Sequence, residues 1–302
     1  MEVGASSLLY ELLAEIGQGS FGKVYKARAV GEGGRLLAVK KFHFCSQSSA
    51  DDNGIPSYIL REVALLDRMK YFQHSNVVKL LDVTATLAGN VLDLTLVLEY
   101  IDQDLSTYLS KAPPSGLGRD NIRLLMLQVM RGLDFLHVNM VLHRDLKPAN
   151  ILVSSCGLVK IADFGMSRLY TFNTALSPNV VTLWYRAPEL LLKSSYMTSV
   201  DVWSAGCVFA ELFLLKPLFD GISEAQQLRM IFEFIGLPSQ DEWPESSPVS
   251  YSLHFGPKNP SPRLLFRMDP YGRDLLLQCL TFAPSRRISA AAALAHPFFN
   301  QH

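Results

Sequence analysis

The spacing of hydrophobic positions along this chain changes near residue 100. Up to about residue 99, short apolar runs rich in β-branched and aromatic residues alternate with glycine-containing turns, which is typical of strands. In that part only 57–66 has apolar residues at helical spacing, and it follows Pro56, which suits the first turn of a helix. Beyond about residue 104, helical spacing dominates. The pattern predicts a strand-rich first part with one helix, followed by a helical second part.

Individual strands and one buried helix can be predicted from particular segments of this pattern. Val24 to Val30 and Arg35 to Phe44 are strand-like runs separated by a glycine turn, which predicts a hairpin, and Leu94 to Leu98 is a compact strand pattern. The most apolar stretch, Val202 to Leu215, contains a glutamate and is too short to span a bilayer. It predicts a helix buried inside a protein core.

Composition narrows the class of protein. The 302 residues suffice for two lobes with separate cores and leave no room for an appended module. The 28 basic residues balance the 28 acidic ones, so no surplus charge indicates a nucleic acid or a membrane as partner. The four cysteines are far apart in the sequence, and no secretion leader opens the chain. We therefore expect an intracellular protein in which the cysteines are small apolar fillers.

A glycine-rich segment near the N-terminus is the first candidate for chemistry. Gly17, Gly19 and Gly22 follow the spacing of loops whose backbone N–H groups approach phosphate oxygens closely. The alternative is a dinucleotide-binding fingerprint, but that motif opens a helix, whereas strand-like residues follow here. Lys40 follows the apolar residues 37–39 on the second strand of the hairpin, where a lysine reaches nucleotide phosphates, and Glu62 on the next helix is its candidate partner.

Two motifs in the middle of the chain indicate phosphoryl transfer. The first places Asp145, Lys147 and Asn150 within one short segment, and the second begins at Asp163. Phosphoryl transfer needs a carboxylate to position a hydroxyl, ligands for metal ions and charge to balance the phosphate, and these side chains suit those tasks. The alternative is that an Arg-Asp pair and a nearby asparagine only cap a turn. The ordered pair of motifs leaves that alternative little room.

Together these residues resemble those of the eukaryotic Ser/Thr protein kinases, and specifically the cyclin-dependent kinases. The ending of the activation segment at 182–189 and the helix signature at 201–207 are similar to that family, and 102–137 and 235–238 are similar to the branch that partners D-type cyclins. The resemblance implies an α+β, bilobal kinase fold. Its expected divisions are a single kinase domain at 1–302, with a β-rich N-lobe at 1–99, a hinge at 100–103 and a mainly helical C-lobe at 104–302.

The resemblance also implies ATP and Mg²⁺ as cofactors. Asp145 is then the acceptor of the substrate hydroxyl proton, and Asn150 and Asp163 are the magnesium ligands. Asp104, at the ribose side, is also suited to cap a helix. The expected ATP site comprises Ile16, Gly17, Gly19, Gly22, Val24, Ala38, Lys40, Leu98, Glu99, Ile101, Asp104, Leu152 and Asp163.

Control is expected in the segment between Gly165 and Thr182. Ser177 occupies the position of the family's phosphorylated threonine, and the resemblance makes Arg61, Arg144 and Arg168 the receivers of that phosphate. Ser20 keeps a hydroxyl in the glycine-rich loop, where a weaker inhibitory phosphorylation is expected because the neighbouring Phe21 cannot be phosphorylated.

Substrate preference is implied by a few further positions. Lys147 is the Ser/Thr-kinase form and is expected to neutralise the transferring phosphate. Val181 and Arg186 resemble a pocket for a proline directly after the target residue, and Thr182 is expected to hydrogen-bond both Asp145 and Lys147. Ala149 replaces the usual glutamate or glutamine, which predicts altered peptide preference with intact chemistry. An ion pair between Glu189 and Arg287 is expected to be structural.

The implied partners are a D-type cyclin, a retinoblastoma-like substrate, ankyrin-repeat and disordered kinase inhibitors, and an activating kinase. Nuclear and cytoplasmic residence is expected, without nucleic-acid or membrane binding. Tyr58 and Ile59 are bulky where relatives carry smaller residues, and these positions are expected to face the cyclin, which leaves the choice of cyclin open. Two alternatives remain, a kinase serving another cyclin and a catalytically idle module that binds cyclins or inhibitors.

Overall fold

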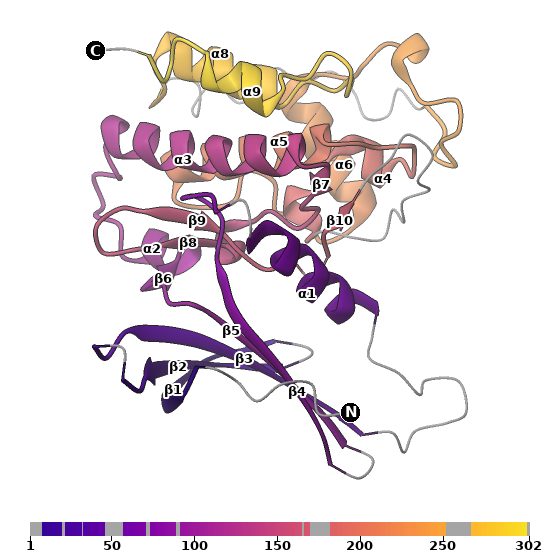
Figure 1. The fold of residues 1–302 in the computed structure, drawn as a ribbon. Helices are drawn as coiled ribbons and strands as arrows, with labels where there is room; N and C mark the ends of the chain where they lie inside the picture. Colours follow the sequence, from indigo (N-terminus) through magenta and orange to yellow (C-terminus); the bar gives the residue numbers. More distant parts are fainter. Residues whose placement is uncertain are drawn as a thin grey trace. The chain divides into compact units, whose positions relative to one another are not determined.

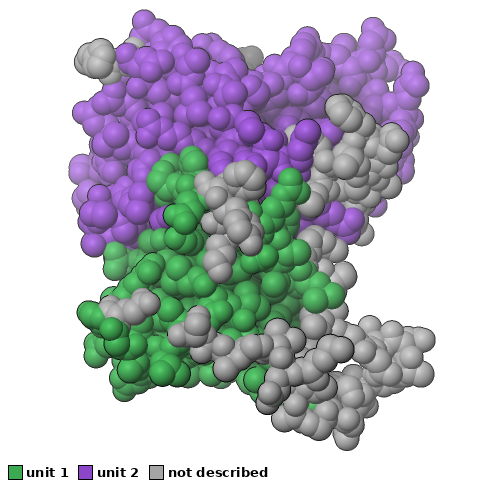
Figure 2. Space-filling model, viewed as in Figure 1, with its two compact units in different colours: residues 1–102, 163–165 green, residues 103–162, 166–302 purple. Residues whose placement is uncertain are grey.

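The computed structural model describes residues 8–19, 22–31, 33–45, 57–70, 73–88, 91–164, 166–169, 182–251 and 267–300. The chain divides into two compact units. Unit 1 comprises residues 1–102 together with 163–165, and unit 2 comprises residues 103–162 together with 166–302 (Figure 2). The elements of each unit are drawn in Figure 1.

Unit 1 is built on a five-stranded antiparallel sheet. The strand order is β1-β2-β3-β5-β4, so the hairpin β2–β3 lies inside the sheet and β1 forms one edge. Helix α1 (Ser57–Lys70) packs against β4. The strands are β1 (Tyr10–Gly19), β2 (Gly22–Ala29), β3 (Leu36–Cys45), β4 (Leu80–Ala88) and β5 (Val91–Glu99).

The two faces of this sheet differ in character because successive side chains of a strand point to opposite faces. One face carries a buried apolar cluster of Ala27, Ala29, Leu37, Val39 and Val97. The other face carries Lys40, which lies directly opposite Val24 on β2. At the start of β2, a Cβ atom on Gly22 would lie 2.4 Å from the Lys41 carbonyl oxygen, so only glycine fits there.

Unit 2 is mainly helical, with short strands between its helices. Strands β6, β8 and β9 form one small sheet and β7 pairs with β10. The elements are β6 (Gln103–Asp104), α2 (Leu105–Ser110), α3 (Arg119–Val138), β7 (Val141–Leu142), η1 (Pro148–Asn150), β8 (Ile151–Val153), β9 (Val159–Ile161), β10 (Arg168–Leu169), η2 (Leu183–Tyr185), α4 (Pro188–Leu191), α5 (Ser199–Leu214), α6 (Glu224–Ile235), η3 (Gln240–Glu242), α8 (Pro270–Cys279) and α9 (Ala290–Leu294).

Helix α5 forms the core of unit 2. Every residue from Val200 to Leu212 is buried, and the helix packs against α3 and α8. A Cβ atom on Gly206 would lie 2.8 Å from the Cβ atom of Cys279, so the absent side chain allows α5 and α8 to approach closely. Within the described residues, no helix combines the length and apolar character needed to cross a membrane.

The sequence predictions for the fold are confirmed. The expected strand at 35–44 runs from Leu36 to Cys45, the single helix of the first part is α1, and the apolar stretch at 202–215 lies within and just after the buried helix α5. Cys207 and Cys279 are buried fillers, whereas Cys156 is exposed. One expectation is corrected. Ile59 is fully buried, so its side chain does not lie on an exposed surface as the sequence analysis expected.

Candidate active site

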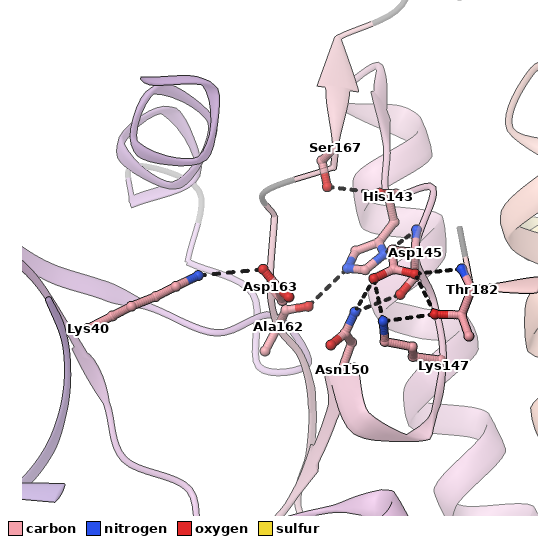
Figure 3. A network of polar contacts seen from close by, with 9 residues as sticks. All are labelled: Lys40, His143, Asp145, Lys147, Asn150, Ala162, Asp163, Ser167 and Thr182. Atoms are coloured by element: carbon pink, nitrogen blue, oxygen red, sulfur yellow. Dashed lines mark hydrogen bonds and ion pairs between the residues drawn. The ribbon is translucent and has the colours of Figure 1, made fainter. Parts of the chain in front are cut away.

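Asp145 is the centre of a hydrogen-bonded network in unit 2 (Figure 3). Its Oδ1 atom accepts hydrogen bonds from the Thr182 backbone N–H at 3.1 Å and from Thr182 Oγ1 at 3.3 Å. Its Oδ2 atom accepts from Lys147 Nζ at 2.7 Å, and Lys147 Nζ also donates to Thr182 Oγ1 at 2.9 Å. The hydrogen bonds expected of Thr182 are therefore present, and they fix the orientation of the Asp145 carboxylate.

Asn150 joins the same network through the nitrogen of its amide. Asn150 Nδ2 donates to the Asp145 carbonyl oxygen at 2.7 Å and to Asp145 Oδ2 at 3.0 Å. Because both bonds use the amide nitrogen, the amide oxygen is the atom left to coordinate a cation. The side chain is held by helix η1, where Pro148 occupies the first turn.

The backbone of the segment at 143–150, which we call the catalytic loop, is held by a carboxylate from helix α5. Asp201 Oδ2 accepts the His143 backbone N–H at 2.9 Å, and Asp201 Oδ1 accepts the Arg144 backbone N–H at 2.8 Å. His137 Nε2 lies 3.0 Å from Asp201 Oδ2. Burial alone would raise the pKa of Asp201, but the hydrogen bond and charge of His137 and the backbone donors reverse that effect and hold the pKa below its usual value. Asp201 is therefore a stable anion that positions the loop.

Arg144 has an unusual backbone and an engaged side chain. Its φ angle is 66°, in the left-handed region that non-glycine residues adopt only when the surrounding structure imposes it. Arg144 Nε donates to the Met166 carbonyl oxygen at 2.7 Å, and Arg144 Nη1 donates to Tyr196 Oη at 3.0 Å. The guanidinium is thus held close to the start of the activation segment, in the part of the chain that precedes the expected phosphorylation site.

Unit 1 contains the second part of the predicted machinery. Lys40 Nζ lies 2.8 Å from Glu62 Oε1 and 3.0 Å from Glu62 Oε2, and 3.5 Å from Asp163 Oδ1 (Figure 3 shows the contact with Asp163). Burial would lower the pKa of Lys40, but the charges of Glu62 and Asp163 outweigh burial and raise it. Burial also raises the pKa of Glu62, an effect that Lys40 partly offsets. The lysine is held as a fixed cation.

Several of the residues expected to contact ATP lie on the Lys40 face of the sheet. Val24 pairs with Lys40 across the β2–β3 register, and Ala38 pairs with Leu98 across the β3–β5 register, so their side chains share that face. A second cation on this face was not predicted from the sequence. Lys26 Nζ lies 4.6 Å from the centroid of the Tyr100 ring, a contact that only the register reveals.

The remaining predicted ATP residues are distributed as follows. Ile16 is half-exposed on β1. Glu99 Oε1 accepts the Lys79 backbone N–H at 2.7 Å, which holds the end of β5. In unit 2, Asp104 pairs with Leu152 between β6 and β8. Asp104 Oδ1 accepts the Thr107 backbone N–H at 2.9 Å. Asp104 therefore caps α2, which is one of the two roles expected of it.

The structure describes some of the residues expected to regulate the chain or to contact its substrate. Arg168 lies on β10, and Arg186 Nη1 donates to Glu224 Oε1 at 2.6 Å. The expected pair of Glu189 and Arg287 is present as two buried hydrogen bonds of 2.6 Å and 2.9 Å. Ser20, Ser177 and Val181 lie outside the described residues, as do the side chains of Tyr58 and Arg61. Gly19 is the last residue of β1.

The arrangement also contains residues that the sequence analysis did not single out for the site. Asp201 was recognised only as part of a helix signature, and Tyr196 was not named. Both contact the catalytic loop from more than 50 residues away in sequence. No local pattern indicates such contacts. Among the described residues, no group of three or more His, Cys, Asp or Glu side chains forms a metal site of its own.

Comparison with known proteins agrees with this geometry. The family model of the protein kinase domain matches residues 10–299. The chain is 53% identical over 293 residues to cyclin-dependent kinase 4 of Xenopus laevis, covering 96% of this chain and 90% of the relative. It is 52% identical over 295 residues to the same-named proteins of Sus scrofa and Mus musculus, covering 97% of this chain and 96% of each relative.

Members of the protein kinase family use ATP and magnesium ions to phosphorylate protein hydroxyl groups. The extent of the match includes both the Lys40 cluster and the Asp145 network, since each lies within residues 10–299. The chain therefore belongs to the protein kinase family and, within it, to the cyclin-dependent Ser/Thr kinases.

Proposed function

We propose that this chain, with a D-type cyclin bound, transfers the γ-phosphate of ATP to serine or threonine residues followed by proline in a retinoblastoma-like protein. The observation that carries the proposal is the network around Asp145, in which Thr182 and Lys147 orient one carboxylate. A carboxylate oriented in this way suits the acceptance of a substrate hydroxyl proton.

The residues present fit ATP and Mg²⁺. Magnesium is usually held by one or two protein oxygen ligands together with phosphates and water. The amide oxygen of Asn150 in unit 2 and the carboxylate of Asp163 in unit 1 are each an oxygen ligand of that kind. When bound, the metal and nucleotide supply the phosphoryl group and neutralise its charge. Lys40, fixed by Glu62, would bind the nucleotide phosphates, and Lys147 would offset negative charge beside the acceptor.

Dependence on a cyclin gives the α1 helix its proposed role. Glu62 reaches Lys40 from α1, so a partner that stabilises this position of α1 also stabilises the ion pair, by as much as its differential affinity for that position. Dependence on a cyclin is supported by the names of the relatives, which are cyclin-dependent kinases 4. The proposed D-type class rests on the segments of the sequence that resemble that branch.

The preference for proline and the remaining partners follow from the same resemblance. Val181 and Arg186 would shape the proline pocket. An activating kinase would phosphorylate Ser177, and the phosphate would bind Arg61, Arg144 and Arg168. Ankyrin-repeat and disordered kinase inhibitors complete the proposed partners, and the nucleus and cytoplasm are the proposed locations. A role in cell-cycle entry would follow from the proposed substrate.

The proposal is tested by phosphate transfer from ATP to a retinoblastoma-type peptide. The chain is assayed alone and with a D-type cyclin, before and after treatment with an activating kinase, beside Asp145→Asn. Activity that needs the cyclin, disappears in Asp145→Asn and weakens in Ser177→Ala supports the proposal. Activity with another cyclin alone would favour a different branch, and absence of transfer despite measured ATP and cyclin binding would favour an idle binding module.

A further inference from the structure

Ile222 is a hydrophobic side chain presented to solvent by a braced turn in unit 2. It is 90% exposed, more than any other large hydrophobic residue of the described part of the chain. Its backbone N–H donates to Gln226 Oε1 at 3.1 Å, and the following residue, Ser223, caps α6 by accepting the Gln226 backbone N–H at 3.2 Å. The exposure of Ile222 is therefore a property of an ordered turn.

The same turn is fastened to Trp184. Trp184 Nε1 donates to the Gly221 carbonyl oxygen at 3.2 Å. The fully buried Gln227 bridges the same two residues, because its Oε1 accepts the Gly221 backbone N–H at 3.0 Å and its Nε2 donates to the Trp184 carbonyl oxygen at 3.1 Å. A Cβ atom on Gly221 would lie 2.6 Å from Gln227 Oε1, so the bridge depends on glycine. Trp184 is itself 40% exposed.

This pair lies close to the Asp145 network along the chain. Trp184 follows Thr182 by two residues, and Thr182 donates two hydrogen bonds to Asp145. Two residues span at most about 7 Å, so the backbone of Trp184 lies within that distance of Thr182. Arg186 and Glu224, joined at 2.6 Å, place a charged pair on the residues that follow Trp184 and Ile222.

A single exposed hydrophobic residue is common on protein surfaces. Here three hydrogen bonds fasten a tryptophan to the turn that carries the isoleucine, and an arginine–glutamate pair lies two residues further along each segment. Rigid aromatic and arginine residues are enriched where binding energy is concentrated, since little side-chain entropy is lost on contact. The pair has the composition of a contact site for another polypeptide.

We infer that Trp184 and Ile222 bind an apolar side chain of the acceptor polypeptide, a few residues from its phosphorylated hydroxyl. The occupant is the acceptor because Trp184 lies two residues after Thr182, which orients Asp145. This inference rests on the proposed function and deepens it, since it names a substrate feature beyond the proline. Ile222 is then a residue that determines specificity.

The test uses the active kinase–cyclin complex and acceptor peptides with a fixed Ser-Pro. Leucine, aspartate or lysine replaces alanine in turn at each of four positions on either side of that pair, and kcat and KM are measured for the peptide and for ATP. The variants are Ile222→Asp, Ile222→Ala and Val138→Asp. Val138 is the matched control, because it is an aliphatic residue 73% exposed at the end of α3.

We expect leucine at one position to raise kcat/KM by about tenfold over alanine, mainly through the KM for the peptide. Ile222→Ala should reduce this preference and Ile222→Asp should replace it with a preference for lysine at the same position, while Val138→Asp keeps the original one. The KM for ATP should not change. A wild-type enzyme that phosphorylates all peptides without an apolar preference, or a preference that Ile222→Asp leaves intact, would overturn the inference alone. Absence of transfer to any peptide would overturn the proposed function with it.

Discussion

Arg287 forms two hydrogen bonds with the carboxylate of Glu189, 98 residues earlier in the chain, with both side chains buried in unit 2. Nη1 and Nη2 of Arg287 each reach one carboxylate oxygen, and Arg287 Nε also donates to the Thr281 carbonyl oxygen at 3.0 Å. The guanidinium thus connects the start of α4 to the segment that follows α8. Removal of either charge would leave the other one buried and uncompensated.

We therefore predict that Glu189→Gln and Arg287→Ala each lower the free energy of unfolding by about 3–5 kcal/mol. Urea denaturation followed by tryptophan fluorescence measures this quantity. Glu233→Gln is the control, since Arg229 and Glu233 form an exposed pair on α6 at 3.2 Å and its loss should change stability by less than about 0.5 kcal/mol. Equal effects at the buried and exposed pairs would contradict the prediction.

The second prediction concerns the dependence of stability on Asp201. Asp201→Asn removes the negative charge and replaces one of the two acceptor oxygens with an NH2 donor, which leaves the His143 or the Arg144 backbone N–H without its acceptor. It should therefore lower the free energy of unfolding at pH 7 by about 3 kcal/mol. The pKa of Asp201 is lower in the folded chain, so the stability from its ionised form is complete above the unfolded pKa and is lost as pH falls through the folded one.

The difference between wild type and Asp201→Asn should consequently stay constant from about pH 8 to pH 5 and narrow as pH falls below about 4. Urea midpoints across this range, at constant ionic strength, provide the measurement. A difference that instead widened on acidification would mean that the folded pKa is raised, and the anchoring role of the anion would have to be abandoned.

Thr182 provides a test of carboxylate orientation. Thr182→Ser keeps a hydroxyl for Asp145 and Lys147, and Thr182→Val keeps the shape without the hydroxyl. We predict that kcat falls by about tenfold or more in Thr182→Val, stays within about threefold in Thr182→Ser, and that the KM for ATP changes little in both. Steady-state assays of the cyclin complex separate these parameters, and similar losses in both variants would point to packing of the methyl group instead.

The two adjacent lysines of β3 offer a matched pair. Lys40 lies beside Glu62 and Asp163, whereas Lys41 lies 6.0 Å from the Tyr25 ring on the opposite face of the sheet. Lys40→Met should lower kcat/KM by about a hundredfold or more, because a fixed cation for the phosphates is lost. Lys41→Met should remain within about twofold. Direct nucleotide titration of both variants would show whether the loss lies in binding, and equal activities would refute the role of Lys40.

The sequence predicted the parts of the site that are encoded locally. The order of Asp145, Lys147 and Asn150 is a short-range pattern, and so is the change from strand to helix near residue 100. Even the longer contact between Lys40 and Glu62 follows from a motif, because each residue has its own recognisable segment. The positions of β2, β3, α1 and α5 were predicted for the same reason.

The supports of the site were not predictable in that way. The bonds from Asp201 to residues 143 and 144, and the bond from Arg144 to Tyr196, form only when distant segments pack together. The position of Lys26 over Tyr100 depends on strand register. The exposure of Ile222 depends on how all other segments of the fold pack around its turn. These features belong to tertiary structure, and propensity or periodicity along the chain carries no signal for them.

The burial of α5 has a consequence for how unit 2 unfolds. Backbone amides that are buried on all sides exchange their hydrogens with solvent only when the surrounding structure opens as a whole. Asp201 lies within the fully buried run from Val200 to Leu212, so the group that fastens the catalytic loop resides in a segment that we expect to open only with the core of unit 2. The anchor of the loop should therefore survive any partial unfolding that leaves this core intact.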